Sequence, residues 1–206
     1  MRDTDLVRGA DGRRRCWWCG DDPTYVAYHD QEWGRPVHDD VRLFEKLCLE
    51  GFQAGLSWLT ILRKREAFRT AFAGFEPERV AAFGATDVAR LLGDPGIVRN
   101  RAKIEATIHN ARRYLELAET GRTLSTLVWA HAPETTPAPR SRAEVPSQTP
   151  ESRALAKELK RHGWRFVGPT TVQAFMESMG LVDHHLVGCT ARGSSVEEGR
   201  APGTTH

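Results

Sequence analysis

The sequence predicts an all-α fold in one compact domain. Apolar residues recur at intervals of three and four over most of the chain, as they do on the buried face of a helix. No segment shows the sustained alternation of apolar and polar residues that is typical of a half-buried strand. A chain of 206 residues also has the usual size of one domain and buries a core without disulfides.

The two helices expected first along the chain have clear apolar faces. Residues 40–51 place Leu43 and Leu47 on the same side of a helix. Residues 57–72 repeat such a pattern, and Ser57 is a suitable N-cap because its hydroxyl accepts a hydrogen bond from the first turn.

The remaining helices follow the same two criteria of spacing and capping. Thr86 and Thr123 are suitable N-caps for two short helices. Longer apolar periodicities over residues 101–118, 151–162 and 170–179 predict the other helices.

Three segments lack this periodicity. Residues 1–15 are polar and basic, and residues 190–206 are small, polar and rich in glycine, so both are expected to be disordered tails. Residues 132–150 are rich in Pro, Ser and Thr and are expected to form an irregular loop inside the domain of residues 16–189.

Composition excludes several classes of protein. The formal net charge of +2 is too small for binding to a polyanion by overall charge. Four cysteines are too few for a disulfide scaffold, and no apolar run approaches the ~20 residues of a membrane span. The N-terminal residues lack the apolar stretch of a signal peptide. We therefore expect a soluble, cytoplasmic protein whose thiols are reduced or bound to metal.

Residues 160–180 read as two helices joined by a tight hairpin. Gly163 is suited to end the first helix, and Pro169 is suited to begin the second. The unpaired amides at Gly168, together with Arg165, suit a DNA phosphate. An ordinary glycine-capped turn between helices is the structural alternative.

Cysteine and histidine residues at the two ends of the chain predict a metal site. Cys16 and His29 near one end, with His185 and Cys189 near the other, supply the ligands of a closed tetrahedral zinc site. Spacing alone also allows Cys19 in place of His29. A redox-active pair of Cys16 and Cys19 is less favoured because no βαβ pattern surrounds it.

Four longer motifs resemble a known family. "CWWCGDDPTYVAYHDQEWGRP", "LCLEGFQAGLSW", "FVGPTTVQAFM" and "LVDHHLVGC" resemble DNA-3-methyladenine glycosylase I, a bacterial family of helix-hairpin-helix repair enzymes, from about Cys16 to Cys189. The resemblance implies a helical glycosylase fold whose structural zinc joins the N- and C-terminal segments. It also implies action as a monomer on double-stranded DNA with alkylated bases, without a membrane.

The resemblance also implies roles for individual residues. It selects Cys16, His29, His185 and Cys189 as the zinc ligands, with Cys19 as a possible exchanged ligand. It implies that the methylated base is bound by Trp18, Tyr25, Tyr28, Glu50 and Trp58.

The physics of these residue types agrees with base binding. Glu50 shares the inward side of its helix with Leu43 and Leu47, where a carboxylate requires a hydrogen-bonding partner. The amino group of a flipped adenine is such a partner, and Trp58 offers a stacking face. The alternative is that Trp58 belongs to the core and that Glu50 pairs with an arginine or a backbone amide.

The expected reaction is hydrolysis of the N-glycosidic bond without strand cleavage. "FVGPTTV" contains no lysine where the lyases of the superfamily carry one. Methylation at N3 gives the base a positive charge and makes it a good leaving group, so binding by Glu50 and the aromatic rings suffices. Asp183 remains a second candidate for a catalytic carboxylate. Gly55 and Leu56 are expected to fill the gap left in the duplex.

Two other functions fit parts of the sequence. A zinc-stabilised DNA-binding module would bind DNA without releasing a base, and a thiol-redox protein would cycle Cys16 and Cys19 without zinc. Base release from methylated DNA, measured with and without a chelator, separates these possibilities.

Overall fold

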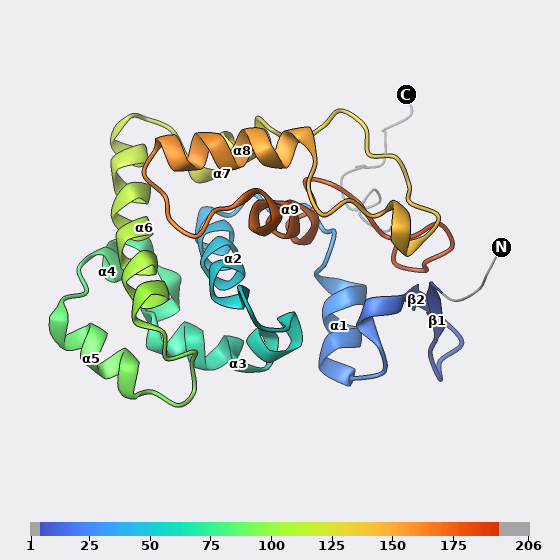
Figure 1. Cartoon of the computed structure of the whole chain (residues 1–206), viewed down its shortest axis with the longest axis horizontal. Coiled ribbons are helices and arrows are strands. Elements are labelled where there is room, and N and C mark those ends of the chain that lie inside the picture. The colour runs from blue at the N-terminus through green and yellow to red at the C-terminus, as the bar shows by residue number, and fades with distance from the viewer. Residues whose placement is uncertain (1–4, 194–206) are drawn as a thin grey trace, which may run out of the picture.

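The computed structural model describes residues 5–193 and confirms a mostly helical fold built around α2 (Asp40–Gln53). Within these residues α2 contacts α3 (Trp58–Ala71), α6 (Arg101–Glu119), α7 (Leu124–Trp129) and α9 (Pro169–Ser178) (Figure 1). Leu43, Phe44, Leu47, Leu49 and Phe52 of α2 are buried in one large apolar cluster. Both ends of the central helix are therefore fixed by neighbours on several sides.

The other elements surround this centre. They are α1 (Pro23–Gln31), α4 (Pro77–Ala81), α5 (Ala85–Gly93) and α8 (Pro150–Arg161), with 3-10 turns at Trp17–Cys19, Ala73–Phe75 and Arg142–Glu144. In the part of the chain that the structure describes, no helix has the length and apolarity needed to cross a membrane.

The capping predictions are confirmed at two of three positions. The Ser57 hydroxyl accepts a hydrogen bond from Thr60 N at 3.2 Å, and Thr123 caps α7 in the same way. The prediction for Thr86 is wrong, because α5 begins at Ala85 with Gly84 as its N-cap. The carboxylate of Asp87 accepts a hydrogen bond from the Gly84 N–H, so the first turn of α5 begins before the predicted cap.

Helix α1 was not expected from the sequence. Its residues, "PTYVAYHDQ", have little apolar periodicity, but the Asp22 carboxylate accepts hydrogen bonds from the amides of Thr24 and Tyr25. Pro23 occupies the first helical position, where its missing N–H is no disadvantage. End signals, and not an apolar face, define this helix.

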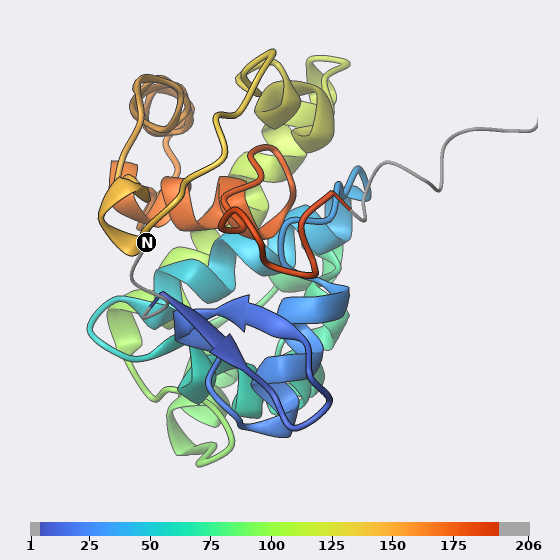
Figure 2. The same cartoon turned by 90° about the vertical axis from the view of Figure 1, so that its right-hand side faces the viewer.

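The expectation of a disordered tail over residues 1–15 is wrong for residues 5–15. These residues form an antiparallel hairpin of β1 (Leu6–Arg8) and β2 (Arg14–Cys16), which lies in front in Figure 2. The guanidinium of Arg15 bonds the carboxylates of Asp11 and Asp30 and is almost fully buried. Three-residue strands are too short for alternation to be recognised. Residues 1–4 lie outside the described residues.

The C-terminal segment lies beside this hairpin (Figure 2). Thr190 N donates a hydrogen bond to Arg14 O at 2.8 Å, so Thr190 is ordered against β2 and not part of a tail. Most of the expected tail, residues 194–206, lies outside the described residues. The irregular stretch before α8 also contacts both terminal segments, since Arg142 N donates to the Asp5 carboxylate and Pro139 O accepts from Val187 N.

Candidate functional site

An aromatic pocket opens to solvent between α1, α2, α3 and α9. Its accessible volume is about 160 Å³, roughly ten times the ~15 Å³ that one water requires. It is lined by Trp18, Tyr25, Tyr28, Trp33, Glu50, Gln53, Trp58, Ala174 and Glu177. The structure thus brings together all five side chains expected to bind the base, and we call this cavity the aromatic pocket.

The rings of the pocket pack on one another. The Trp18 ring centroid lies 5.1 Å from that of Tyr25 and 5.0 Å from that of Trp33, and Tyr28 lies 5.5 Å from Trp58. Burial raises the pKa of Tyr25 to about 12, so its phenol stays neutral at physiological pH. Trp33 lies in the first quoted motif but was not singled out from the sequence.

Glu50 is a buried carboxylate in the wall of this pocket. Only 4% of its side chain is exposed, and Lys46 Nζ lies 2.8 Å from Oε1. Burial raises the pKa of Glu50, while the neighbouring ammonium opposes that rise. Glu50 therefore has a cationic partner, although this partner is a lysine and not the arginine that was the sequence-based alternative.

Lys46 itself was missed in the sequence. It lies one turn before Glu50, a spacing that brings two helical side chains together. Besides Glu50, its ammonium donates to the Tyr28 hydroxyl at 2.9 Å and lies 3.1 Å from the centroid of the Trp58 ring. Because this cation covers one face of Trp58, only the opposite face or the edge is left for another group.

Glu177 on α9 is a second carboxylate in the pocket wall. Its Oε1 lies 2.8 Å from His184 Nδ1, and it also accepts a hydrogen bond from Gln173. His184 thus bonds to α9 and is not one of the clustered metal ligands.

A groove continues from the aromatic pocket towards the loop before α3. It has a volume of about 180 Å³ and shares Glu50, Gln53 and Ala174 with the pocket. Its other walls are Ala54, Gly55, Leu56, Thr170 and Thr171. Gly55 has a φ of 83°, which turns the chain, and the Leu56 side chain that follows is 43% exposed.

The hairpin between α8 and α9 leads into this groove, because Thr170 and Thr171 of α9 line it. Gly163 has a φ of 79° and ends α8, while Gly168 is the N-cap of α9 and Pro169 its first residue. No atom lies near the position of an added Cβ at Gly168. The hairpin geometry expected from the sequence is therefore present, with the Arg165 side chain exposed.

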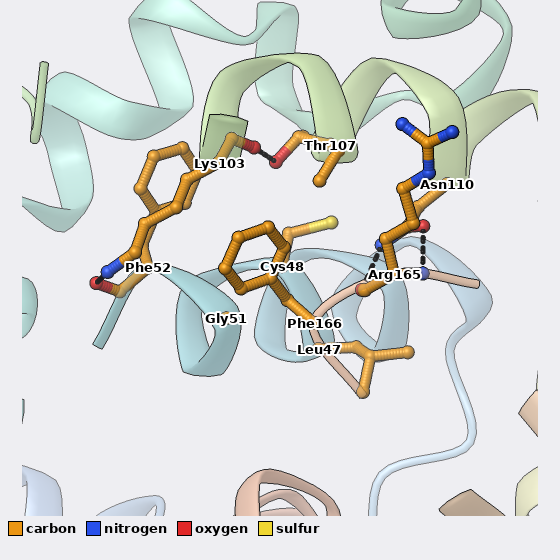
Figure 3. Close-up of a pocket in the computed structure, with 10 residues that line it drawn as sticks. Leu47, Cys48, Gly51, Phe52, Lys103, Thr107, Asn110, Arg165 and Phe166 are labelled. Atoms are coloured by element: carbon orange, nitrogen blue, oxygen red, sulfur yellow. Dashed lines mark hydrogen bonds between the residues drawn. The ribbon is translucent and has the colours of Figure 1, made fainter. Parts of the chain in front are cut away.

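Helix α6 holds the hairpin and the loop in place (Figure 3). Asn110 donates to Arg165 O at 3.0 Å and accepts from Arg165 N at 2.8 Å. Lys103 on the same helix donates to the carbonyls of Phe52 and Ala54 at 2.9 and 2.6 Å. One helix thus fixes both segments that border the groove.

The hairpin also packs directly on α2. Phe166 has a φ of 56°, in the left-handed region that a phenylalanine rarely adopts. A Cβ at Gly51 would lie 3.2 Å from the Phe166 Cβ, so glycine is what permits this close approach.

The four predicted zinc ligands form one buried cluster. The ligand atoms of Cys16, His29, His185 and Cys189 all lie within 4.8 Å of one another. Cys189 Sγ is 3.5 Å from His29 Nε2 and 3.5 Å from His185 Nδ1. A hydrogen bond from Cys16, joined by bonds from both imidazoles, lowers the pKa of Cys189 and favours its thiolate.

These distances fit a tetrahedral metal. Zn–S bonds of ~2.3 Å and Zn–N bonds of ~2.0 Å set sulfur–nitrogen separations of about 3.5 Å. The histidine ring nitrogens that point away from the cluster also have partners, as they do at metal sites. His29 Nδ1 lies 2.8 Å from the Asp30 carboxylate, and His185 Nε2 lies 3.2 Å from Trp33 O. Cys19 Sγ instead donates to Gly20 O and is not in the cluster.

Asp183 lies beside this cluster and does not line the aromatic pocket. Its Oδ1 accepts a hydrogen bond from His185 N at 3.0 Å. This contact turns the backbone so that His185 faces the other ligands, and the structure gives Asp183 no contact with Glu50.

Comparisons with known proteins agree with this arrangement. A model of the methyladenine glycosylase family matches residues 18–192. DNA-3-methyladenine glycosylase 1 of Escherichia coli is 49% identical over 178 residues, which are 85% of this chain and 95% of that protein.

Solved structures of such enzymes also superpose on the chain. A crystal structure of 3-methyladenine DNA glycosylase I is 47% identical, with a TM-score of 0.82 over 85% of this chain and 98% of its own. The Staphylococcus aureus enzyme, described for its recognition of 3-methyladenine, is 40% identical with a TM-score of 0.79 over 82% and 92%. The chain belongs to the methyladenine glycosylase family.

Proposed function

We propose that the protein flips 3-methyladenine out of alkylated DNA and hydrolyses its N-glycosidic bond. The observation that carries this proposal is the convergence of Glu50 and several aromatic rings in one pocket that is open to solvent. Family membership supports it, because the relatives at 46–49% identity are DNA-3-methyladenine glycosylases.

The pocket suits a flat, cationic base. Tyr25, Tyr28 and Trp18 supply faces and edges for a purine, and such aromatic contacts stabilise a base taken out of the stack. Trp58 contributes less cation–π attraction than a ring with both faces free, because Lys46 already occupies one face. Glu50 then provides the negative charge that complements N3-methylated adenine.

The chemistry demands little of the protein. Breaking the bond between C1′ and N9 moves its electron pair onto the base, which neutralises the positive charge carried by the methylated purine. Water then completes the hydrolysis at C1′. Glu50 holds the cationic base during this step, and no Schiff base forms because "FVGPTTV" contains no lysine. Lys46 is no alternative nucleophile, since its ammonium is held by Glu50, Tyr28 and Trp58.

The groove beside the pocket is proposed to hold the duplex. Leu56, exposed after the turn at Gly55, is placed to fill the gap that the flipped base leaves. The first turn of α9, which borders the groove, and the exposed Arg165 before it suit backbone phosphates. We infer that one monomer contacts double-stranded DNA through these segments.

We infer that the buried cluster holds one structural zinc ion. Cys16 and His29 on one side and His185 and Cys189 on the other would bind it, and Asp30 would orient His29. When bound, the metal cross-links the N-terminal hairpin to the C-terminal segment, as a disulfide does in an oxidising compartment. The cluster and the aromatic pocket have separate linings, so the metal takes no part in catalysis.

Release of base from methylated DNA tests the proposal. The protein is expected to liberate 3-methyladenine, detected by chromatography, and to leave abasic strands intact until they are treated with alkali. Duplex binding without base release would instead support the alternative of a zinc-stabilised binding module.

A further inference from the structure

Lys46 has three close partners behind the wall of the aromatic pocket. An ammonium has three donors and no acceptor. One donor reaches Glu50 Oε1 at 2.8 Å, one reaches the Tyr28 hydroxyl at 2.9 Å, and the charge lies 3.1 Å from the centre of Trp58. Only 6% of the side chain is exposed, so water does not replace these partners.

This contact restricts the Tyr28 hydroxyl. A phenol carries one proton and two lone pairs, and one lone pair is taken by Lys46. The phenol remains protonated at neutral pH, because a tyrosine ionises only near pH ~10. Among residues 5–193 no protein acceptor receives that proton, and Tyr28 lines the pocket. The hydroxyl therefore presents a donor to whatever enters.

We propose that Lys46 is a positioning residue that sets the hydrogen-bonding pattern of the pocket by turning Tyr28 into a donor beside the acceptor Glu50. This inference rests on the proposed function. It assigns base selectivity to a residue that need not touch the base.

A donor beside an acceptor is the complement of one edge of adenine. That edge presents N7 as an acceptor and the 6-amino group as a donor, whereas guanine presents two acceptors, N7 and O6. A methyl group at N3 lies on the opposite edge and leaves this pattern unchanged. With Tyr28 donating and Glu50 accepting, 3-methyladenine is satisfied and 3-methylguanine brings its O6 against a carboxylate.

The charge on Lys46 makes this arrangement sensitive to pH. Burial lowers the pKa of Lys46 to about 8, although Glu50 opposes the shift. Above that pH the amine becomes neutral and gains a lone pair, so the Tyr28 proton is free to turn towards Lys46 and away from the pocket. The affinity for 3-methyladenine is therefore expected to fall as the pH rises through about 8.

Other charged groups also lie around Lys46. Besides Glu50, the charged side chains near Lys46 line a recess together with Lys46 and Tyr28. They are Glu32, Arg42, Glu45, Arg65 and Arg69. Glu32 is paired with Arg65, and Glu45 is paired with Arg69.

Titration of free bases into matched variants tests the inference. Lys46→Met keeps length and removes the charge, Lys46→Arg keeps the charge, and Tyr28→Phe removes the hydroxyl. We expect Lys46→Met to bind 3-methyladenine about tenfold more weakly, the effect of one lost hydrogen bond, and to lose most of its preference over 3-methylguanine. Lys46→Arg is expected to retain the preference and to abolish the decline near pH 8.

The double variant Lys46→Met/Tyr28→Phe shows whether Lys46 acts through Tyr28. If it does, adding Lys46→Met to Tyr28→Phe lowers the affinity for 3-methyladenine by less than about threefold. The reason is that both changes remove the same interaction. A full effect in that background, or unchanged selectivity in Lys46→Met, overturns the inference. Lys46→Gln replaces the methionine variant if the latter does not fold. Failure of the parent protein to bind 3-methyladenine would instead refute the proposed function.

Discussion

Replacing Glu50 with glutamine removes the only charge in the pocket wall that we assign to binding the methylated base. The substitution preserves the shape of the side chain. It removes the negative charge next to a cationic purine and leaves Lys46, 2.8 Å away, without its ionic partner. The nucleotide in DNA is cationic and the released base is neutral, so the two ligands respond differently.

The magnitude follows from the burial of the site. A carboxylate ~4 Å from a cation contributes about 4 kcal/mol at an effective dielectric constant of ~20. This corresponds to as much as a thousandfold loss in the rate of excision, at ~1.4 kcal/mol for each factor of ten. Neutral 3-methyladenine loses only a hydrogen bond to its amino group, about tenfold in affinity.

Single-turnover excision from methylated DNA and titration of free base measure these two effects. The substitution also destabilises the fold, because breaking a buried ion pair costs ~3–5 kcal/mol. Glu45→Gln is the matched control, since Glu45 is on the same helix, is buried, and pairs with Arg69 outside the pocket. It is expected to lower the melting temperature without slowing excision.

Asp183→Asn decides between the two candidate carboxylates. Because Asp183 contacts His185 N beside the metal cluster, its substitution is expected to weaken the metal site and to leave the excision rate of the zinc-loaded protein nearly unchanged. Normal excision by Glu50→Gln together with an inactive, zinc-loaded Asp183→Asn protein would refute the assignment of Glu50.

The remaining predictions concern the metal and the DNA-facing segments. Cys16→Ser and His185→Ala are expected to abolish stoichiometric zinc and lower the melting temperature, whereas Cys19→Ser retains zinc; metal analysis of the purified variants decides, and loss of zinc in Cys19→Ser would reassign the ligand. Asp30→Asn, which removes the partner of His29, is expected to weaken zinc binding about 10–100-fold in a competition with a chelator, and unchanged affinity would contradict that role. Gly168→Asp is expected to weaken binding to duplex DNA of any sequence at low salt without changing affinity for free base, so equal duplex affinity would remove the hairpin from the interface. Asn110→Ala, which releases the backbone of Arg165, is expected to lower duplex affinity by about tenfold while free-base binding is retained; equal losses in both assays would point to a general loss of folding.

The sequence predicts the long helices because their apolar faces are continuous. Leu43 and Leu47 lie in the core as the spacing requires, and Ser57 and Thr123 cap the helices they precede. Helix α1 was not predicted, because its boundary depends on Asp22 and Pro23 and not on an apolar stripe. The N-terminal hairpin was not predicted because its strands are short and Arg15 holds it by ion pairs to Asp11 within the hairpin and to Asp30 on α1.

The five side chains expected in the pocket were predictable from the sequence, but the hydrogen bonds and ion pairs between them were not. Residue type and resemblance led to Glu50 and the aromatic side chains, which the structure gathers in one cavity. The role of Lys46 depends on three partners from three helices, which only the tertiary arrangement reveals. Its spacing of four residues from Glu50 was the one available signal. Likewise, distances and not spacing separate His29 from Cys19 as a ligand.

The most direct test of the account is to follow a titration of the zinc-loaded protein with free 3-methyladenine by NMR. We expect saturable shifts at the indole and phenol signals of Trp18, Tyr25, Tyr28 and Trp58, with smaller shifts at His29 and His185, whose rings contact pocket tryptophans. Glu50→Gln should weaken this response without moving it elsewhere. Shifts centred on the metal cluster, or none at saturating base, would contradict the claim that the aromatic pocket receives the methylated base.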